Sequence, residues 1–122
     1  MGESAQSSTV LVVDDDPSLR LLCRVNLELD GYRVVEAKSI AEAEAALRDE
    51  VVDVMLLDVH VGQASGLDLL GSLHGLDRSP AVVLVTGSAQ VDEETRSKAD
   101  GVVVKPFQLE ELRGTVRRLA GS

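Results

Sequence analysis

The feature of this sequence that most constrains its fold is a regular alternation between short apolar runs and longer stretches with helical periodicity. The apolar runs are rich in Val and Leu and cover residues 10–13, 32–37, 54–57, 81–85 and 102–104. The helical patterns cover residues 17–29, 40–48, 66–76, 92–98 and 109–119. Strands and helices that alternate in this way form βαβ units, which build a parallel sheet with helices on both faces. We therefore predict a doubly wound α/β fold.

Two segments differ from the rest of the pattern. The run at residues 32–37 includes Arg33 and Glu36, whereas the other four runs are apolar throughout, as expected for strands buried on both faces. We therefore predict that residues 32–37 form an edge strand. The helical pattern at residues 92–98 has almost no apolar stripe, and we expect this helix to be short or frayed.

Length and charge exclude several classes of protein. The chain has 122 residues, the size of one domain, which we place at residues 9–120 after a small polar tail at residues 1–8 that we expect to be mobile. The chain has 12 Lys and Arg residues against 21 Asp and Glu residues, which gives a net charge of −9. This negative charge disfavours direct binding to nucleic acid and favours binding to a cation or to a basic partner. No apolar run approaches the roughly 18 residues of a membrane span. We expect a cytoplasmic protein without a membrane segment, in which the single Cys23 is a buried thiol.

Polar side chains follow four of the predicted strands. The residues at these strand ends are Asp14, Asp15, Asp16, Asp58, Thr86 and Lys105. In open parallel sheets ligands bind beyond the carboxyl ends of the strands, so we expect these groups to lie at one edge of the sheet. Asp16 precedes a proline at the start of a helix and is interpreted as its N-cap.

A cluster of carboxylates with a lysine and a threonine suits phosphoryl chemistry. Holding Asp14 and Asp15 close to Asp58 costs electrostatic repulsion that a bound cation relieves. Oxygen ligands with room for water favour Mg²⁺. A metal ion together with Lys105 and the Thr86 hydroxyl could hold a phosphoryl group. Asp58 is the candidate nucleophile, because it stands alone at the end of a central strand.

These motifs resemble the receiver domain of two-component response regulators. The resemblance covers roughly residues 9–119, with the motifs in the family's order. The matching runs are VLVVDDDP at residues 10–17, VMLLD at 54–58, VLVT at 83–86 and KPF at 105–107. The resemblance implies a five-stranded flavodoxin-like sheet in the order 2-1-3-4-5 and a cis peptide bond before Pro106.

The resemblance also assigns roles to individual residues. Asp58 would accept a phosphoryl group from a phosphohistidine on a sensor histidine kinase or a phosphotransfer protein. Mg²⁺ would be bound by Asp58, by Asp15 directly, by Asp14 through water and by the backbone carbonyl of His60. Thr86 would donate a hydrogen bond to the phosphoryl oxygens and Lys105 would pair with them. The protein would act as a switch that catalyses its own phosphorylation, with an output partner or output domain that the sequence does not identify.

The chain departs from the family's usual pattern in three places. Gly62 stands where the family usually has a proline, Ser65 stands where it usually has an acidic residue, and Val102 replaces an aromatic residue that reports phosphorylation. Without that aromatic group, we expect the switch to order or shift the weak helix at residues 92–98. The arginines of the last helix could contact acidic residues of a second copy in a homodimer, but we interpret them first as the cationic end of a helix.

Three alternatives remain open at this point. A pseudo-receiver would share the fold but act as an interaction module without phosphorylation. A haloacid-dehalogenase-like phosphatase would use Asp14 and Asp16 as an Asp-x-Asp motif, but it would leave Asp58 unexplained and would need acidic residues after Lys105. A flavodoxin-like flavin binder would require a hydroxyl-rich phosphate loop, where this chain has three carboxylates.

Overall fold

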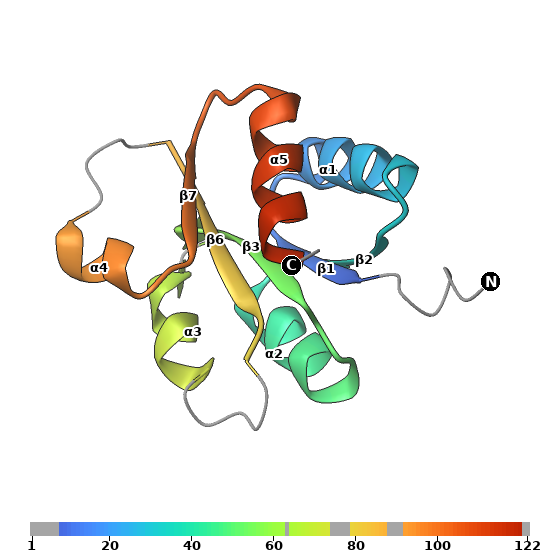
Figure 1. Ribbon diagram of the computed structural model, residues 1–122. Coiled ribbons are helices and arrows are strands. Elements are labelled where there is room, and N and C mark those ends of the chain that lie inside the picture. The colour runs from blue at the N-terminus through green and yellow to red at the C-terminus, as the bar shows by residue number, and fades with distance from the viewer. Residues whose placement is uncertain (1–7, 63, 74–78, 88–91, 121–122) are drawn as a thin grey trace.

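Strands and helices alternate along the chain as the hydrophobic pattern predicts (Figure 1). The computed structural model describes residues 8–62, 64–73, 79–87 and 92–120. The strands of its main sheet are β1 (Thr9–Val13), β2 (Arg33–Ala37), β3 (Val54–Asp58), β6 (Ala81–Thr86) and β7 (Gly101–Val104). Its helices are α1 (Pro17–Leu29), α2 (Ile40–Asp49), α3 (Leu67–Ser72), α4 (Glu93–Ser97) and α5 (Leu109–Ala120).

The main sheet is parallel and has the predicted topology. Within the described residues it contains five strands in the order β2-β1-β3-β6-β7, which is 2-1-3-4-5 when these strands are counted along the chain. β2 is an edge strand with mostly half-buried residues, also as predicted. The register places Asp58 beside Val85 and Thr86 beside Val104. The carboxyl ends of the central strands therefore lie at one edge of the sheet.

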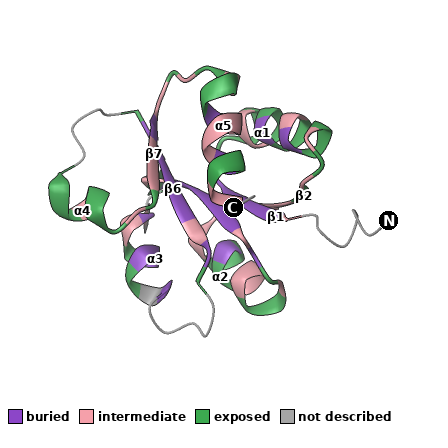
Figure 2. Cartoon of the chain, in the orientation of Figure 1, coloured by how far each residue is buried: buried purple, intermediate pink, exposed green. Residues whose placement is uncertain are grey.

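Helices cover both faces of the sheet and bury two separate groups of apolar side chains. On one face, α1 and α5 pack against alternate residues of the strands, with Cys23, Leu27, Leu112 and Val116 as their buried side chains (Figure 1). On the other face, α2 and α3 cover the remaining strand residues. The central strands β1, β3 and β6 are buried almost throughout, whereas α4 has no buried residue (Figure 2).

Most of the predicted elements agree with the structure, but the connection after β3 differs. A short antiparallel pair, β4 (His60–Val61) and β5 (Ala64–Ser65), lies between β3 and α3 and was not predicted. The third helix begins at Leu67, one residue later than expected, and the part of its predicted span from residue 74 onward lies outside the described residues. Of the predicted mobile tail, residues 1–7 also lie outside them. Among the described residues, none of the helices combines the length and the apolar character needed to cross a bilayer.

Candidate functional site

The polar residues at the strand ends meet at one edge of the sheet. Asp14, Asp15 and Asp16 follow β1, Asp58 ends β3, Thr86 ends β6 and Lys105 follows β7. One carboxylate oxygen from each of Asp14, Asp15 and Asp58 lies within 4.8 Å of the others. Asp14 is buried, Asp58 is half-buried and Asp15 is exposed, so the cluster opens to solvent on the Asp15 side.

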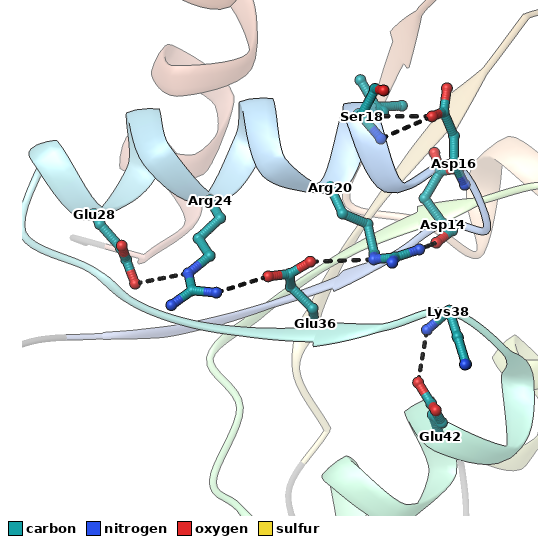
Figure 3. Close-up of polar contacts among 10 residues, drawn as sticks. Asp14, Asp16, Ser18, Arg20, Arg24, Glu28, Glu36, Lys38 and Glu42 are labelled. Carbon is teal, nitrogen blue, oxygen red and sulfur yellow. Dashed lines mark hydrogen bonds and ion pairs between the residues drawn. The ribbon is translucent and has the colours of Figure 1, made fainter.

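Asp16 does not belong to this cluster and instead caps α1. Its Oδ1 accepts hydrogen bonds from the backbone N–H groups of Ser18 at 2.9 Å and Leu19 at 3.4 Å (Figure 3). Pro17 occupies the first turn of the helix, where its missing N–H has no cost. The capping role predicted for Asp16 is therefore confirmed.

Asp14 is held between a hydrogen bond and an ion pair. Its Oδ1 accepts from the backbone N–H of Asp16 at 2.9 Å, and its Oδ2 lies 3.3 Å from the Nζ atom of Lys105. Burial raises the pKa of Asp14, and the nearby charge of Asp58 adds to this, while the Asp16 N–H and Lys105 oppose it. The net effect is a raised pKa, because burial and the charge of Asp58 together outweigh the hydrogen bond and the ion pair.

Lys105 is the cationic partner of two of the three carboxylates. Its Nζ lies 3.5 Å from Asp58 Oδ2 as well as 3.3 Å from Asp14 Oδ2. Burial alone would lower the pKa of Lys105, but the charges of Asp14 and Asp58 outweigh burial and the pKa is raised. The residue therefore stays protonated. The peptide bond between Lys105 and Pro106 is cis, as expected, and the Lys105 N–H donates to the Thr86 carbonyl oxygen at 2.7 Å.

The segment after Asp58 folds back toward the carboxylates. The backbone N–H of His60 donates to Asp58 Oδ1 at 3.3 Å, and the N–H of Gly62 donates to Asp15 Oδ2 at 3.1 Å. The N–H of Gly66 donates to the carbonyl oxygen of Val59 at 2.6 Å, which closes the base of the β4–β5 pair. The segment is thus joined to two of the three carboxylates through main-chain donors.

Arg20 is a further residue that positions the site, and sequence analysis did not identify it. Its Nη1 donates to the carbonyl oxygen of Asp14 at 2.7 Å, and its Nε pairs with Glu36 on the edge strand at 3.1 Å (Figure 3). Glu36 also pairs with Arg24 at 3.0 Å. These contacts tie the turn after β1 to both α1 and β2. No local sequence pattern indicates them, because they depend on how α1 packs across the sheet.

Cys23 lies in a narrow apolar hollow behind the carboxylates. The hollow lies between α1 and the sheet, and its lining includes Asp14, Asp58 and Leu19. Cys23 is 4% exposed, and burial raises the pKa of its thiol to about 11, with the charge of Asp14 adding to the shift. The prediction of a buried thiol is confirmed.

The sequence model of the response regulator receiver domain matches residues 10–117, almost the whole chain. The chain belongs to the response regulator receiver domain family. Response regulators are components of two-component systems, and they receive phosphoryl groups from histidine kinases. The haloacid-dehalogenase alternative is not supported, since Asp16 caps α1 instead of joining Asp14 in the cluster.

Curated relatives include longer regulators of transcription. The transcriptional regulatory protein KdpE of Mycobacterium tuberculosis is 38% identical over 115 residues, which cover 89% of this chain and 51% of KdpE. The transcriptional regulatory protein CpxR of Escherichia coli is 31% identical over 112 residues, which cover 90% of this chain and 48% of CpxR. The chain thus spans about half the length of these relatives.

Solved structures share the fold over nearly the whole receiver domain. The response regulator TrrA of Thermotoga maritima, described in complex with Mg²⁺ and BeF, has a TM-score of 0.83 and 29% identity over 92% of this chain and 98% of TrrA. The non-phosphorylated HemR receiver domain of Leptospira biflexa has a TM-score of 0.85 and 29% identity over 95% of this chain and 96% of its own. The predicted fold class is therefore confirmed.

Proposed function

We propose that this receiver domain transfers a phosphoryl group from a phosphohistidine to Asp58 in the presence of Mg²⁺, and that the new charge switches an interaction surface. The observation that carries the proposal is the placement of Asp58. Its carboxylate lies in a cluster with Asp14 and Asp15 and 3.5 Å from the ammonium group of Lys105. The domain then acts as a switch that catalyses its own modification, not as a turnover enzyme.

The chemistry of the donor set fits Mg²⁺. The carboxylates of Asp14, Asp15 and Asp58 offer only oxygen atoms, and the exposed side of the cluster leaves room for water ligands. We assign these three residues and the backbone carbonyl of His60 as the metal ligands, with Asp14 acting through water. When bound, Mg²⁺ supplies positive charge that offsets the carboxylates and the phosphoryl oxygens. The description of TrrA in complex with Mg²⁺ and BeF supports this assignment.

In the proposed transfer, an oxygen of the Asp58 carboxylate attacks the phosphorus atom. A new O–P bond forms while the P–N bond to the donor imidazole breaks; the electron pair of that bond stays on the imidazole nitrogen, and the donor ring leaves as a neutral imidazole because its other nitrogen carries a proton. The product is an aspartyl phosphate and a free histidine. The His60 N–H, 3.3 Å from Asp58 Oδ1, restricts the rotation of the attacking carboxylate.

Two further side chains act on the phosphoryl group once it is attached to Asp58. Lys105 already lies 3.5 Å from the Asp58 carboxylate, so its ammonium group can pair with the phosphoryl oxygens after a small movement. Thr86 ends the neighbouring strand and is 5% exposed, and its hydroxyl is the proposed hydrogen-bond donor to the same oxygens. Inward movement of Thr86 and Lys105 shifts the surface formed by α4, β7 and α5.

The partners follow from the same chemistry. The donor is a sensor histidine kinase or a phosphotransfer protein, which places the domain in the cytoplasm. The output is either a separate partner or another domain, as in regulators of the length of KdpE. Residues 9–120 form the receiver domain, and a homodimer through α5 is a further output that we propose.

The experiment that tests this function is the intact mass of the protein after incubation with phosphoramidate, with and without Mg²⁺. We expect one added phosphoryl group that requires Mg²⁺ and is absent in Asp58→Asn. Asp16→Asn is the matched control, because Asp16 caps α1 outside the cluster, and it should be phosphorylated like the wild type. The absence of both a mass adduct and beryllofluoride binding in the wild type would identify a pseudo-receiver instead.

A further inference from the structure

A main-chain hydrogen bond joins the β4–β5 pair to Asp15, one of the three clustered carboxylates. The backbone N–H of Gly62 donates to Asp15 Oδ2 at 3.1 Å, although the two residues are 47 positions apart in sequence. Gly62 lies between the two strands of the β4–β5 pair, so this pair is joined directly to the turn after β1. The contact uses no side chain of Gly62, which is why sequence analysis did not identify it.

Asp15 is the member of the cluster that most needs such a contact. Lys105 lies beside Asp14 and Asp58, and each of these also accepts a hydrogen bond from a backbone N–H two residues later in the chain. Asp15 is exposed, and an exposed carboxylate rotates freely unless a neighbour fixes it. Among the hydrogen bonds of the described residues, the Gly62 N–H is the donor that reaches Asp15.

The backbone of Gly62 is suited to this contact. Its φ angle is +63°, in the left-handed region that glycine adopts without strain. A Cβ at this position would meet nothing within 4 Å, so a side chain has space and only the backbone angle opposes it. Proline would lose the contact on two counts, because it lacks the N–H and fixes φ near −65°.

We propose that the main-chain N–H of Gly62 is a positioning group for Asp15 and thereby sets the affinity of the cation site. A carboxylate has two oxygens, and the Gly62 bond occupies Oδ2 while Oδ1 can face the cation. Hydrogen-bonded partners of metal ligands orient them, and their loss commonly weakens metal binding about 10- to 100-fold. The proposal rests on the proposed function, because it concerns the same cation site.

The first test needs no metal. In ¹⁵N-labelled protein without Mg²⁺, the Gly62 amide proton should be shifted downfield by its bond to the carboxylate. Asp15→Asn removes the charge of the acceptor, so we expect the Gly62 amide resonance to move upfield. Asp16→Asn changes the adjacent carboxylate, which caps α1, and should leave the Gly62 resonance in place. An unchanged Gly62 resonance in Asp15→Asn would overturn the proposal.

The second test measures Mg²⁺ affinity directly by titration calorimetry. Replacing Gly62 by glycolic acid through semisynthesis turns the N–H into an ester oxygen without adding a side chain, and should weaken Mg²⁺ binding about tenfold. Gly62→Asn keeps the N–H and tolerates a positive φ, so it should bind Mg²⁺ nearly as the wild type does. Thermal unfolding without Mg²⁺ checks that both proteins are folded.

The outcomes separate this proposal from the proposed function. Wild-type affinity for Mg²⁺ in the folded glycolic-acid protein would overturn the role of Gly62 and leave the cation site intact. A wild-type protein that binds no Mg²⁺ would overturn the cation site and, with it, any role of Gly62 in its affinity. Equal weakening in the Gly62→Asn and glycolic-acid proteins would show that loop conformation matters and the hydrogen bond does not.

Discussion

The ammonium nitrogen of Lys105 lies 3.5 Å from Oδ2 of Asp58, although the strands that carry these residues are separated by β6. The long side chain of Lys105 crosses the end of β6 and reaches Asp14 as well, at 3.3 Å. One cation therefore balances two carboxylates. The third, Asp15, is contacted by the Gly62 N–H. The site is thus held together before any ion is bound, but it carries more negative than positive charge.

The first prediction concerns this charge balance. Lys105→Met keeps most of the length of the side chain and removes its charge, so a bound cation no longer faces a repelling ammonium group. Even at the dielectric constant of water, an ammonium group and a divalent cation roughly 5 Å apart repel by about 1.7 kcal/mol, so we expect Mg²⁺ to bind at least about tenfold more tightly. Titration calorimetry at neutral pH measures this. Lys98→Met, which alters an exposed lysine just after α4, is the matched control and should leave the affinity unchanged. Weaker binding in Lys105→Met would contradict the charge argument.

The second prediction concerns Gly66, which packs against the acceptor strand. A Cβ at Gly66 would overlap the carbonyl oxygen of Asp58 and come within 3.2 Å of Leu57 Cδ1. We therefore expect Gly66→Ala to lower the free energy of unfolding by about 1–3 kcal/mol. Gly71→Ala is the matched control, since a Cβ there meets nothing within 4 Å and alanine favours a helix. It should raise the free energy of unfolding by about 0.5–1 kcal/mol. Urea unfolding of both variants tests the pair, and equal stability would refute the steric argument.

Much of the fold and the centre of the site follow from local sequence patterns. The alternation of apolar and helical runs predicts the parallel sheet, and the mixed run that contains Arg33 and Glu36 is correctly predicted as an edge strand. The order of the strands is implied only by the resemblance to receiver domains. The cluster of Asp14, Asp15 and Asp58 is predictable because residues at the carboxyl ends of parallel strands share one edge of the sheet. These features need no knowledge of side-chain packing.

The features that sequence analysis did not identify depend on tertiary contacts or on the main chain. The bond of Arg20 to the carbonyl of Asp14 requires the packing of α1 across the sheet. The role proposed for Gly62 uses a backbone N–H, which every residue except proline carries. The β4–β5 pair has two residues in each strand, too few to show a period-two pattern.

The third prediction uses an ion pair far from the site. Arg113 on α5 donates to both carboxylate oxygens of Asp30 at the end of α1, at 2.8 and 2.6 Å. The hydrogen bonds from Arg113 lower the pKa of Asp30 below its ordinary value of 3.8. Because the pKa of Asp30 is lower in the folded than in the unfolded protein, its ionised carboxylate stabilises the folded state. This stabilisation is complete at pH values above the unfolded-state pKa, and it is lost as the pH falls through the folded-state pKa.

Asp30→Asn should therefore be less stable than the wild type at pH 7, and the difference should shrink as the pH is lowered below about 4. Glu110→Gln is the matched control. Glu110 contacts the same arginine at 3.4 Å, but its side chain is 81% exposed, so its loss should change stability little. Urea unfolding of the three proteins at a series of pH values gives the comparison. A stability difference for Asp30→Asn that stays constant down to pH 2 would show that the ion pair is not its cause.

The fourth prediction concerns α4. All five residues of this helix are described, and none of their side chains is buried. Its main local support is the Asp92 side chain, whose Oδ1 accepts from the Thr95 N–H at 2.7 Å. A helix this short is marginal without packing, so the amides of residues 93–98 should exchange with solvent nearly as fast as unstructured amides. The amides of α5 near the buried Leu112 and Val116 should be strongly protected.

Phosphorylation should increase the protection of residues 93–98. Among the described residues from 93 to 102, Ala99 and Val102 are the ones that pack against the core, and Val102 lacks an aromatic ring that could change rotamer. A signal from Asp58 therefore has to reach this face through the backbone of β6, which ends at Thr86, and of β7, which Lys105 follows. Ordering of α4 is the response that such a backbone shift permits. Hydrogen exchange measured with and without beryllofluoride, with the α5 amides as internal control, tests this. Unchanged exchange at residues 93–98 together with a demonstrated beryllofluoride complex would show that α4 does not carry the signal.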